Sequence, residues 1–180
     1  MSHKVLVVTG SPRANGNTDM LADAFIRGAE AAGNQVFRFD AGRAQIKGCQ
    51  DCKFCIGNNG KCNQNDDMQQ AYEYLHECDV LVLATPIYFF CMSAQIKAFI
   101  DRMYCDIGKP FAVKSSILLT VQEDENPIVA DNAVNTYRSI INYVGWENLG
   151  IISVPSVHAI GAIAGNPKLV EAYKLGINLT

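Results

Sequence analysis

The sequence predicts an α/β fold in which a doubly wound, five-stranded parallel sheet carries helices on both faces. Five short runs rich in Val, Ile and Leu occur along the chain, and segments with apolar residues at helical spacing separate them. Strands that alternate with helices in this way form parallel sheets that are covered on both faces. The 180 residues contain no internal repeat and are predicted to form one domain, residues 1–180.

The strand runs are short and almost wholly apolar, as expected of strands that are buried on both sides. Turn-forming residues end them, and Gly10 and Pro12 follow the first run. The five strands are predicted at residues 4–9, 36–39, 80–84, 116–121 and 149–154.

Helix boundaries follow from the chemistry of helix ends. Asn, Thr and Ser side chains cap the first turn, acidic residues favour the positive end of the helix dipole, and glycine favours the stop. Proline is favourable at the first helical position. Helices are therefore predicted from Asn17 or Thr18 to Gly33, from Asp66 and Asp67, from Ser93, over about residues 128–144, and from Asn166 and Pro167.

Composition excludes several function classes. The chain has 15 Lys and Arg against 18 Asp and Glu, a formal net charge of −3, whereas binders of nucleic acid or anionic membranes present a basic face. Charged residues make up 18%, below the ~25% of an average domain, which predicts a well-filled core. No run reaches the ~20 apolar residues of a membrane span. The first apolar run is also too short for a secretory signal, so a cytoplasmic location is expected.

The loop after the first strand, residues 10–18 (GSPRANGNT), has the features of an anion site. It leads into a helix N-terminus, where free N–H groups and the helix dipole favour negative charge. Ser11, Asn17 and Thr18 add side-chain donors, and Arg13 offers a guanidinium fork suited to phosphate. A terminal phosphate monoester fits this loop best, and a plain capped turn is the alternative.

Two other phosphate motifs fail on this loop. A Walker A loop needs GxxxxGK[ST], but Gly10 and Gly16 are one residue too far apart and Asn17 replaces the lysine. A dinucleotide fingerprint needs three glycines, and only these two are present.

Apolar and aromatic residues follow the third strand directly, at the edge where doubly wound folds bind ligands. Pro86, Ile87 and Tyr88 are expected to form part of a pocket there, whereas Phe89 and Phe90 could equally pack in the core. The acidic loop after the fourth strand, residues 120–124, is expected to face the same pocket.

Four of the seven cysteines lie in the long irregular stretch 41–65, which follows the second strand. Cys49, Cys52 and Cys55 form a CxxCxxC run, and Cys62 follows after six residues. A compact set of four thiolates is typical of iron–sulfur ligation. Zinc and free, redox-active thiols are the alternatives. The other three cysteines and the three histidines are interpreted as ordinary core or surface residues.

The phosphate loop resembles that of the flavodoxin-like NAD(P)H-dependent FMN reductases, in which the pattern GSxRxxGNT binds the phosphate of FMN. The resemblance continues through residues 85–89 (TPIYF), 92–102 (MSAQIKAFIDR) and 165–176 (GNPKLVEAYKLG). It implies strand order 2-1-3-4-5. It also implies an FMN site formed by Ser11, Arg13, Asn15, Gly16, Asn17, Thr18, Pro86, Ile87, Tyr88 and Phe89.

The cysteine stretch resembles that of the iron–sulfur flavoproteins, a branch of the same group. This resemblance implies that Cys49, Cys52, Cys55 and Cys62 ligate a [4Fe–4S] cluster. The implied function is an FMN-binding oxidoreductase or electron-transfer flavoprotein, with NAD(P)H or reduced ferredoxin as donor and a homodimer or homotetramer as the assembly. No catalytic acid, base or nucleophile is required of the protein, since the cofactors carry the redox chemistry.

A second function class accounts for part of the sequence. A non-enzymatic domain that binds a phosphorylated ligand, with a zinc or free-thiol cysteine loop, would use the same anion loop. It does not account for the apolar residues 86–88 at the edge of the sheet.

Overall fold

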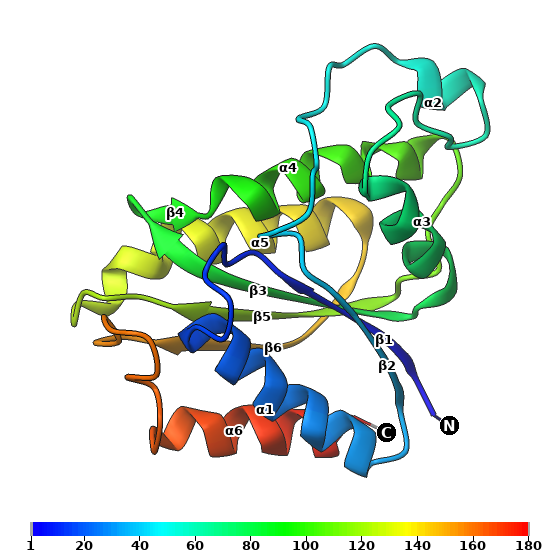
Figure 1. Cartoon of the computed structure of the whole chain (residues 1–180). Coiled ribbons are helices and arrows are strands. Elements are labelled where there is room, and N and C mark those ends of the chain that lie inside the picture. Colours follow the sequence, from blue (N-terminus) through cyan, green and yellow to red (C-terminus); the bar gives the residue numbers. More distant parts are fainter. Residues whose placement is uncertain (1, 180) are drawn as a thin grey trace.

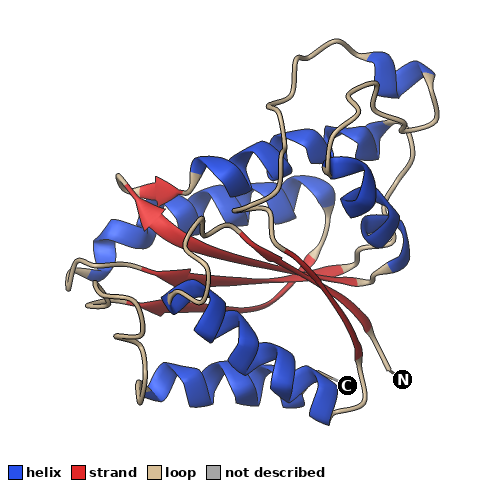
Figure 2. Cartoon of the chain, viewed as in Figure 1, coloured by secondary structure: helices blue, strands red, loops and turns tan. Residues whose placement is uncertain are grey.

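A central sheet separates two layers of helices in the computed structural model, which describes residues 2–179 (Figures 1 and 2). The sheet contains β1 (Lys4–Thr9), β2 (Gln35–Phe39), β3 (Val80–Tyr88), β4 (Cys91–Met92), β5 (Ser115–Val121) and β6 (Glu147–Val154). Five of these strands are parallel neighbours in the order β2-β1-β3-β5-β6. The α/β parallel class is therefore confirmed.

The expected count of five strands, in order 2-1-3-4-5, needs a correction. The sheet has six strands, because the two-residue β4 folds back and pairs antiparallel with the end of β3. β3 also runs four residues beyond its predicted end, so Thr85 to Tyr88 form strand rather than loop. The cause is pairing: Pro86 still lies opposite Val121 of β5, and Ile87 lies opposite Met92 of β4.

Helices α3, α4 and α5 cover one face of the sheet, and α1 and α6 cover the other (Figure 1). Short 3₁₀ helices precede α5 and follow α4, so α5 begins three residues later than predicted. The helices are α1 (Asn17–Ala31), α2 (Phe54–Gly57), α3 (Met68–Glu77), α4 (Ala94–Arg102), α5 (Asp131–Val144) and α6 (Pro167–Ile177), with 3₁₀ helices Met103–Ile107 and Pro127–Ala130.

The core has two halves because alternate side chains of each strand point to opposite faces. Leu6 and Val8 of β1 pack with the layer of α3, α4 and α5, whereas Val5 and Val7 pack with α1 and α6. All four are fully buried. The sheet is thus buried on both sides, as the apolar strand runs predict.

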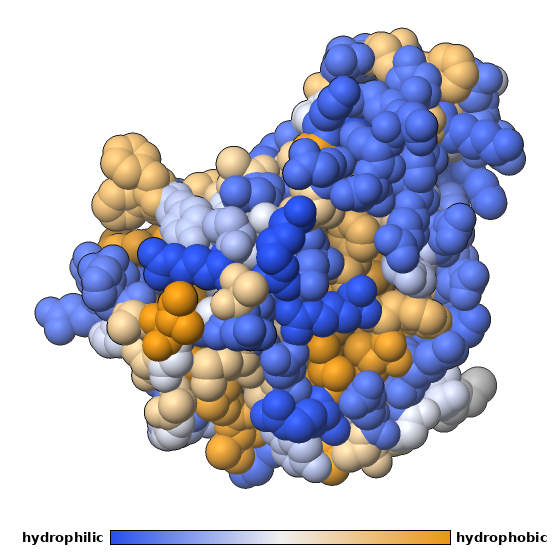
Figure 3. Space-filling model, in the orientation of Figure 1, coloured by the Kyte–Doolittle hydropathy of each residue, from blue (hydrophilic) through white to orange (hydrophobic). Residues whose placement is uncertain are grey.

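The cysteine stretch is not wholly irregular, since it contains the single-turn helix α2. It projects from the corner of the molecule near the end of α4, and its surface is mostly hydrophilic in Figure 3. Among residues 2–179, no helix has both the length and the apolar character that crossing a bilayer requires.

Candidate functional site

A hollow open to solvent lies beyond the carboxyl ends of the parallel strands. Four segments line it: the loop after β1, the end of β3, and the segments after β5 and β6. The lining residues are Ser11, Arg13, Gly16, Asn17, Thr18, Pro86, Ile87, Tyr88, Val121, Gln122, Glu123, Val157, His158 and Ile160.

The loop after β1 is shaped by its own backbone N–H groups. The N–H of Arg13 donates to Ser11 Oγ at 3.2 Å, and the N–H of Asn15 donates to Asp19 Oδ2 at 2.8 Å. Asn15 adopts a left-handed backbone with φ 55° and does not line the hollow. The Arg13 side chain is exposed at the rim, in keeping with its predicted position beside an anion.

Asn17 has a different structural role from the predicted helix cap. Gly16 is the N-cap residue of α1 and no side chain caps the helix. The Asn17 amide instead joins the segment after β6: Nδ2 donates to Ala159 O at 2.8 Å, and Oδ1 accepts from the N–H of Ile163 at 3.2 Å. These partners lie more than 140 residues away in sequence, so local capping rules could not identify them.

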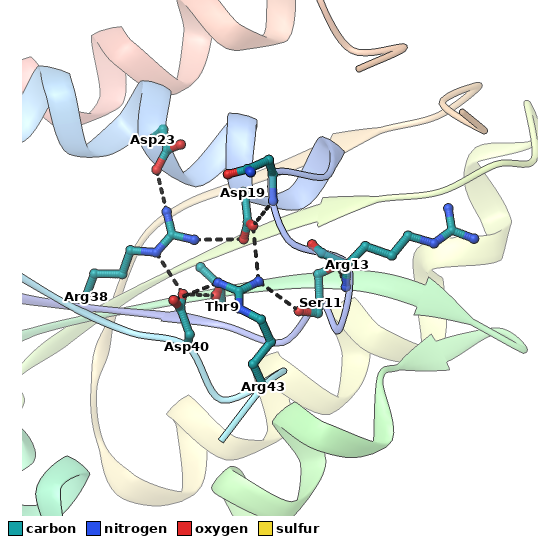
Figure 4. Close-up of polar contacts among 9 residues, drawn as sticks. Thr9, Ser11, Arg13, Asp19, Asp23, Arg38, Asp40 and Arg43 are labelled. Atoms are coloured by element: carbon teal, nitrogen blue, oxygen red, sulfur yellow. Dashed lines mark hydrogen bonds and ion pairs between the residues drawn. The ribbon is translucent and has the colours of Figure 1, made fainter. Parts of the chain in front are cut away.

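A network of charges lies beneath this loop (Figure 4). Arg38 pairs with Asp19, Asp23 and Asp40, and Arg43 pairs with Asp19 and Asp40. Burial alone would raise the pKa of Asp40, but hydrogen bonds from Arg38, Thr9 and Arg43 outweigh burial and hold that pKa below its usual value. The network joins the end of β2 to the first turns of α1.

The end of β3 is tied to the loop after β1 by one serine. Ser93 Oγ donates to Gly10 O at 2.7 Å and accepts from the N–H of Ile96, which confirms Ser93 as the cap of α4. The N–H of Ser93 donates to Thr85 Oγ1. Pro86, Ile87 and Tyr88 are thereby held at the hollow, where the sequence predicts a pocket wall.

Phe89 lies outside this hollow, at the tip of the β3–β4 hairpin, and is 97% exposed. The interpretation of Phe89 and Phe90 as core residues is therefore wrong. Both have positive φ, and their rings meet edge to face with centroids 5.9 Å apart. Figure 3 shows apolar atoms projecting from the body where Figure 1 places β4. The two rings border an adjacent acidic depression with Glu123, Asp124 and Glu125.

The segments after β5 and β6 complete the hollow. Gln122 and Glu123 line it, so the acidic loop faces the pocket as expected. His158 also lines it, and its Nδ1 lies 2.9 Å from Glu123 Oε1 at the exposed rim. Val157, His158 and Ile160 also line the hollow but were not predicted from the sequence. The order of the strands could have indicated them, because the last parallel strand ends at the same edge of the sheet as the others.

The four clustered cysteines line a second, narrow hollow beside Arg102, Tyr104 and Cys105. Cys49 and Cys52 are exposed, and Cys55 is buried in α2. Cys105 was expected in the core, and it is buried, but it also borders this hollow. Burial raises the pKa of the Cys105 thiol, which favours its protonated form near neutral pH.

The cysteines around this hollow match a [4Fe–4S] cluster in the number and type of their donor atoms. A [4Fe–4S] cluster uses four thiolates on four different irons, so the sulfurs need only surround one hollow. All four predicted cysteines do so. Lys53, which could have activated a thiol, is instead paired with Asp51.

Arg102 closes the cysteine stretch at its base. Its Nη1 donates to Lys47 O at 2.9 Å and to Asp66 Oδ2 at 2.7 Å, and Nη2 donates to Asp66 Oδ1 at 3.1 Å. Asp66 also accepts from the N–H of Lys47. The side chains of Arg102 and Asp66 are 1% and 5% exposed. The two ends of the stretch are therefore held together by a buried ion pair.

Comparisons with known proteins agree with this geometry. The iron–sulfur flavoprotein of Methanosarcina thermophila is 28% identical over 167 residues, 91% of this chain and 83% of that protein. An iron–sulfur flavoprotein of Archaeoglobus fulgidus is 36% identical over 100 residues, 56% of this chain. That match spans only 45% of the archaeal protein, so the chain spans about half the length of some curated relatives it matches.

Among solved structures, an NAD(P)H:quinone oxidoreductase from Methanothermobacter marburgensis has a TM-score of 0.77 at 17% identity. The alignment covers 99% of this chain and 98% of that one, and it shows a shared fold. Residues 3–161 match the family model described as NADPH-dependent FMN reductase. That range includes the loop after β1 and the ends of β3, β5 and β6, and it confirms the resemblance of the sequence motifs. The chain belongs to the NADPH-dependent FMN reductase family.

Proposed function

We propose that this chain is an FMN-dependent oxidoreductase that takes electrons from NAD(P)H. The hollow beyond the strand ends carries the proposal, because it places a phosphate-type loop opposite the apolar wall of Pro86, Ile87 and Tyr88. Bound FMN supplies the redox chemistry, since it exchanges electrons singly or in pairs. The residues of the chain bind and orient it.

Each side of the hollow suits one end of the cofactor. Arg13 and the N-terminus of α1 favour a phosphate group, and the end of β3 offers the side chains of Pro86, Ile87 and Tyr88 to a ring. The zinc or free-thiol binding module would use the first side only. The residues of the hollow that are proposed to bind FMN are Ser11, Arg13, Gly16, Asn17, Thr18, Pro86, Ile87 and Tyr88. Asn15 and Phe89, which the resemblance also implies, lie outside the hollow.

The test is the visible spectrum of the purified chain, followed by anaerobic addition of NADH or NADPH. We expect the yellow absorption of a flavin, or its appearance after FMN is added, and bleaching by at least one nicotinamide. A chain that binds no FMN would overturn the proposal and favour the binding-module alternative.

We further propose that Cys49, Cys52, Cys55 and Cys62 hold a [4Fe–4S] cluster. Support comes from the hollow that the four cysteines share, from the buried Arg102–Asp66 ion pair at the base of the stretch and from the names of the relatives. A cluster exchanges one electron at a time, so the pair of cofactors would connect hydride donors with single-electron carriers such as ferredoxin.

Cys52→Ser tests the cluster directly. Protein prepared without oxygen should contain about four irons per chain, the cubane complement. The variant should lose iron, sulfide and the brown absorption while it keeps the flavin, because residue 52 is remote from the FMN hollow. Cys78→Ser is the matched control, since Cys78 is buried elsewhere. An unchanged spectrum in Cys52→Ser would refute the cluster.

The two hollows lie at opposite ends of α4, with Ser93 at one end and Arg102 at the other. Nine helical residues span about 14 Å, so the two hollows of one chain do not touch. We propose a homodimer or homotetramer, because the cysteine hollow of one copy could then approach the FMN hollow of another. A monomer in size-exclusion chromatography with light scattering would contradict this.

Two broader expectations remain part of the proposal. We propose a cytoplasmic location, where cysteines stay reduced and able to ligate iron. Residues 1–180 are proposed to fold as one FMN-binding domain with the cysteine stretch inserted at residues 41–65.

A further inference from the structure

A buried negative charge lies beside the loop that forms the anion-binding end of the FMN hollow. Asp19 belongs to the first turn of α1 and is 2% exposed. Its carboxylate accepts the N–H of Asn15 at 2.8 Å and so fixes the left-handed turn of the phosphate loop. A carboxylate in this position would also repel a phosphate, because both charges belong to the same helix end.

Two arginines lie against this carboxylate (Figure 4). Arg38 Nη2 is 2.8 Å from Asp19 Oδ1, and Arg43 Nη1 is 3.2 Å from Asp19 Oδ2. Arg38 is shared among three carboxylates, since it also pairs with Asp23 and Asp40. Arg43 is shared as well, because its Nη2 lies 2.6 Å from Asp40 Oδ2. Two arginines thus face three carboxylates, so the loss of either one would add a second uncompensated negative charge beneath the loop.

Arg43 also contacts the loop itself. Its Nη1 reaches Ser11 O at 3.5 Å, and the neighbouring N–H of Gly42 donates to Thr9 O at 2.8 Å. A Cβ on Gly42 would lie 2.1 Å from Ser11 O, so only glycine permits this approach. Arg43 comes from the segment after β2, whereas Ser11 and Asp19 come from the loop and helix after β1.

We propose that Arg43 is a positioning residue for the phosphate end of the flavin. By placing a second positive charge beside Asp19 and contacting the Ser11 carbonyl, Arg43 reduces the repulsion between the buried carboxylate that shapes the loop and a phosphate. Arg43 lies outside the lining of the hollow and acts through these two residues. Its contribution therefore sets the preference of the chain for FMN over riboflavin, which has no phosphate. This inference rests on the proposed FMN function.

The experiment compares dissociation constants for FMN and riboflavin on the full chain after its flavin has been removed. Arg43→Gln should raise the dissociation constant for FMN by about ten- to hundredfold, the range for hydrogen bonds to charged groups. The dissociation constant for riboflavin should change by less than about twofold, the usual spread of additive effects. Arg43→Lys should recover part of the FMN affinity, because it restores the charge.

Arg27→Gln is the matched control. Arg27 lies exposed on α1, two turns beyond Asp19, and its removal changes the net charge equally. It should leave the ratio of the two dissociation constants unchanged. Equal losses for FMN and riboflavin in Arg43→Gln, or no loss for either, would overturn the inference and leave Arg43 a purely structural residue.

A double variant keeps the test decisive if Arg43→Gln does not fold. Asp19→Asn retains an oxygen for the Asn15 N–H but removes the charge that Arg43 compensates. Asp19→Asn/Arg43→Gln should therefore regain most of the wild-type FMN preference. A preference as low as that of Arg43→Gln, or below one tenth of the wild-type ratio, would refute charge compensation. Failure of the wild-type chain to bind FMN would instead refute the proposed function.

Discussion

Single polar side chains connect the walls of the FMN hollow. Asn17 joins the start of α1 to the segment after β6, and Ser93 joins the start of α4 to the loop after β1. Both side chains are buried, so water cannot easily replace their partners. The shape of the hollow therefore depends on a few hydrogen bonds between segments that are remote in sequence.

Asn17→Ala should lower the free energy of unfolding by about 1–3 kcal/mol, because it leaves Ala159 O and the N–H of Ile163 without their partner. It should also speed FMN release, since the segment carrying His158 loses its anchor. Urea unfolding and stopped-flow release of FMN measure the two effects.

Asn135→Ala, at an exposed position of α5, serves as the control for Asn17→Ala. It should change neither quantity. Faster FMN release without any loss of stability would also contradict the proposed anchor role, because both effects arise from the same two hydrogen bonds.

Residue types in the phosphate loop could be predicted from the sequence, but their partners could not. The loop pattern places Ser11, Gly16 and Thr18 at a helix N-terminus, and the structure puts all three on the hollow. Asn17 has the right type for a cap but bonds across the sheet edge instead. Asp19, Arg38 and Arg43 gave no local signal, because their pairing exists only after β1 and β2 lie side by side.

At the scale of elements, α1 and α6 pack backbone to backbone. A Cβ on Gly28 would lie 2.1 Å from Tyr173 O, and a Cβ on Gly176 would lie 2.3 Å from Phe25 O. Two glycines at facing positions thus let the helices approach more closely than side chains would permit. The spacing of apolar residues along each helix predicts its buried face, whereas the short distance between α1 and α6 depends on this pair of glycines.

Gly28→Ala should destabilise the chain by about 1–3 kcal/mol, the usual cost of overpacking, although alanine is the better helix former. Thermal and urea unfolding give the measurement. Gly57→Ala is the control, since nothing lies within 4 Å of a Cβ built there. A stabilised Gly28→Ala variant would show that α1 and α6 separate without cost.

Secondary structure could be predicted best where local and tertiary preferences agree. β1 and the start of α6 match their predicted positions because apolar runs and caps coincide with the packing. The end of β3 could not be predicted, since Pro86 favours a loop and only pairing with β5 and β4 extends the strand. The ion pair between Arg102 and Asp66 could not be predicted from local sequence either, because the two residues are far apart in the chain.

At the scale of the whole molecule, ion pairs make the free energy of unfolding depend on pH in the acidic range. Burial alone would raise the pKa of Asp66, but hydrogen bonds from Arg102 and the N–H of Lys47 outweigh it and hold the pKa below its usual value. The pKa of Asp40 is lowered in the same way. A lowered native pKa adds stability above the unfolded pKa of about 3.9, and that stability is lost as pH falls further.

Asp66→Asn should cost about 3 kcal/mol at pH 7, because it leaves the buried Arg102 without a counter-charge. The difference from wild type should shrink as pH falls below about 4, because Asp66 of the unfolded wild-type chain then binds a proton that the folded chain, with its lowered pKa, does not yet bind. Urea unfolding from pH 7 to pH 3 measures it.

Asp101→Asn, at an exposed pair with Lys97, is the control for Asp66→Asn and should show little effect at any pH. A constant difference between Asp66→Asn and wild type across the whole pH range would contradict the assigned shift in pKa.

The packing of α6 on α1 sets the order in which the protein becomes complete during synthesis. Asn34, just after α1, bonds to Leu179 O across 145 residues of sequence, and α6 covers the lower face of the sheet. A ribosome releases α1 long before it makes α6, so the nascent chain exposes the apolar surface that α6 covers until that helix has been made. Chains that stop before residue 167 would present this surface to chaperones and proteases.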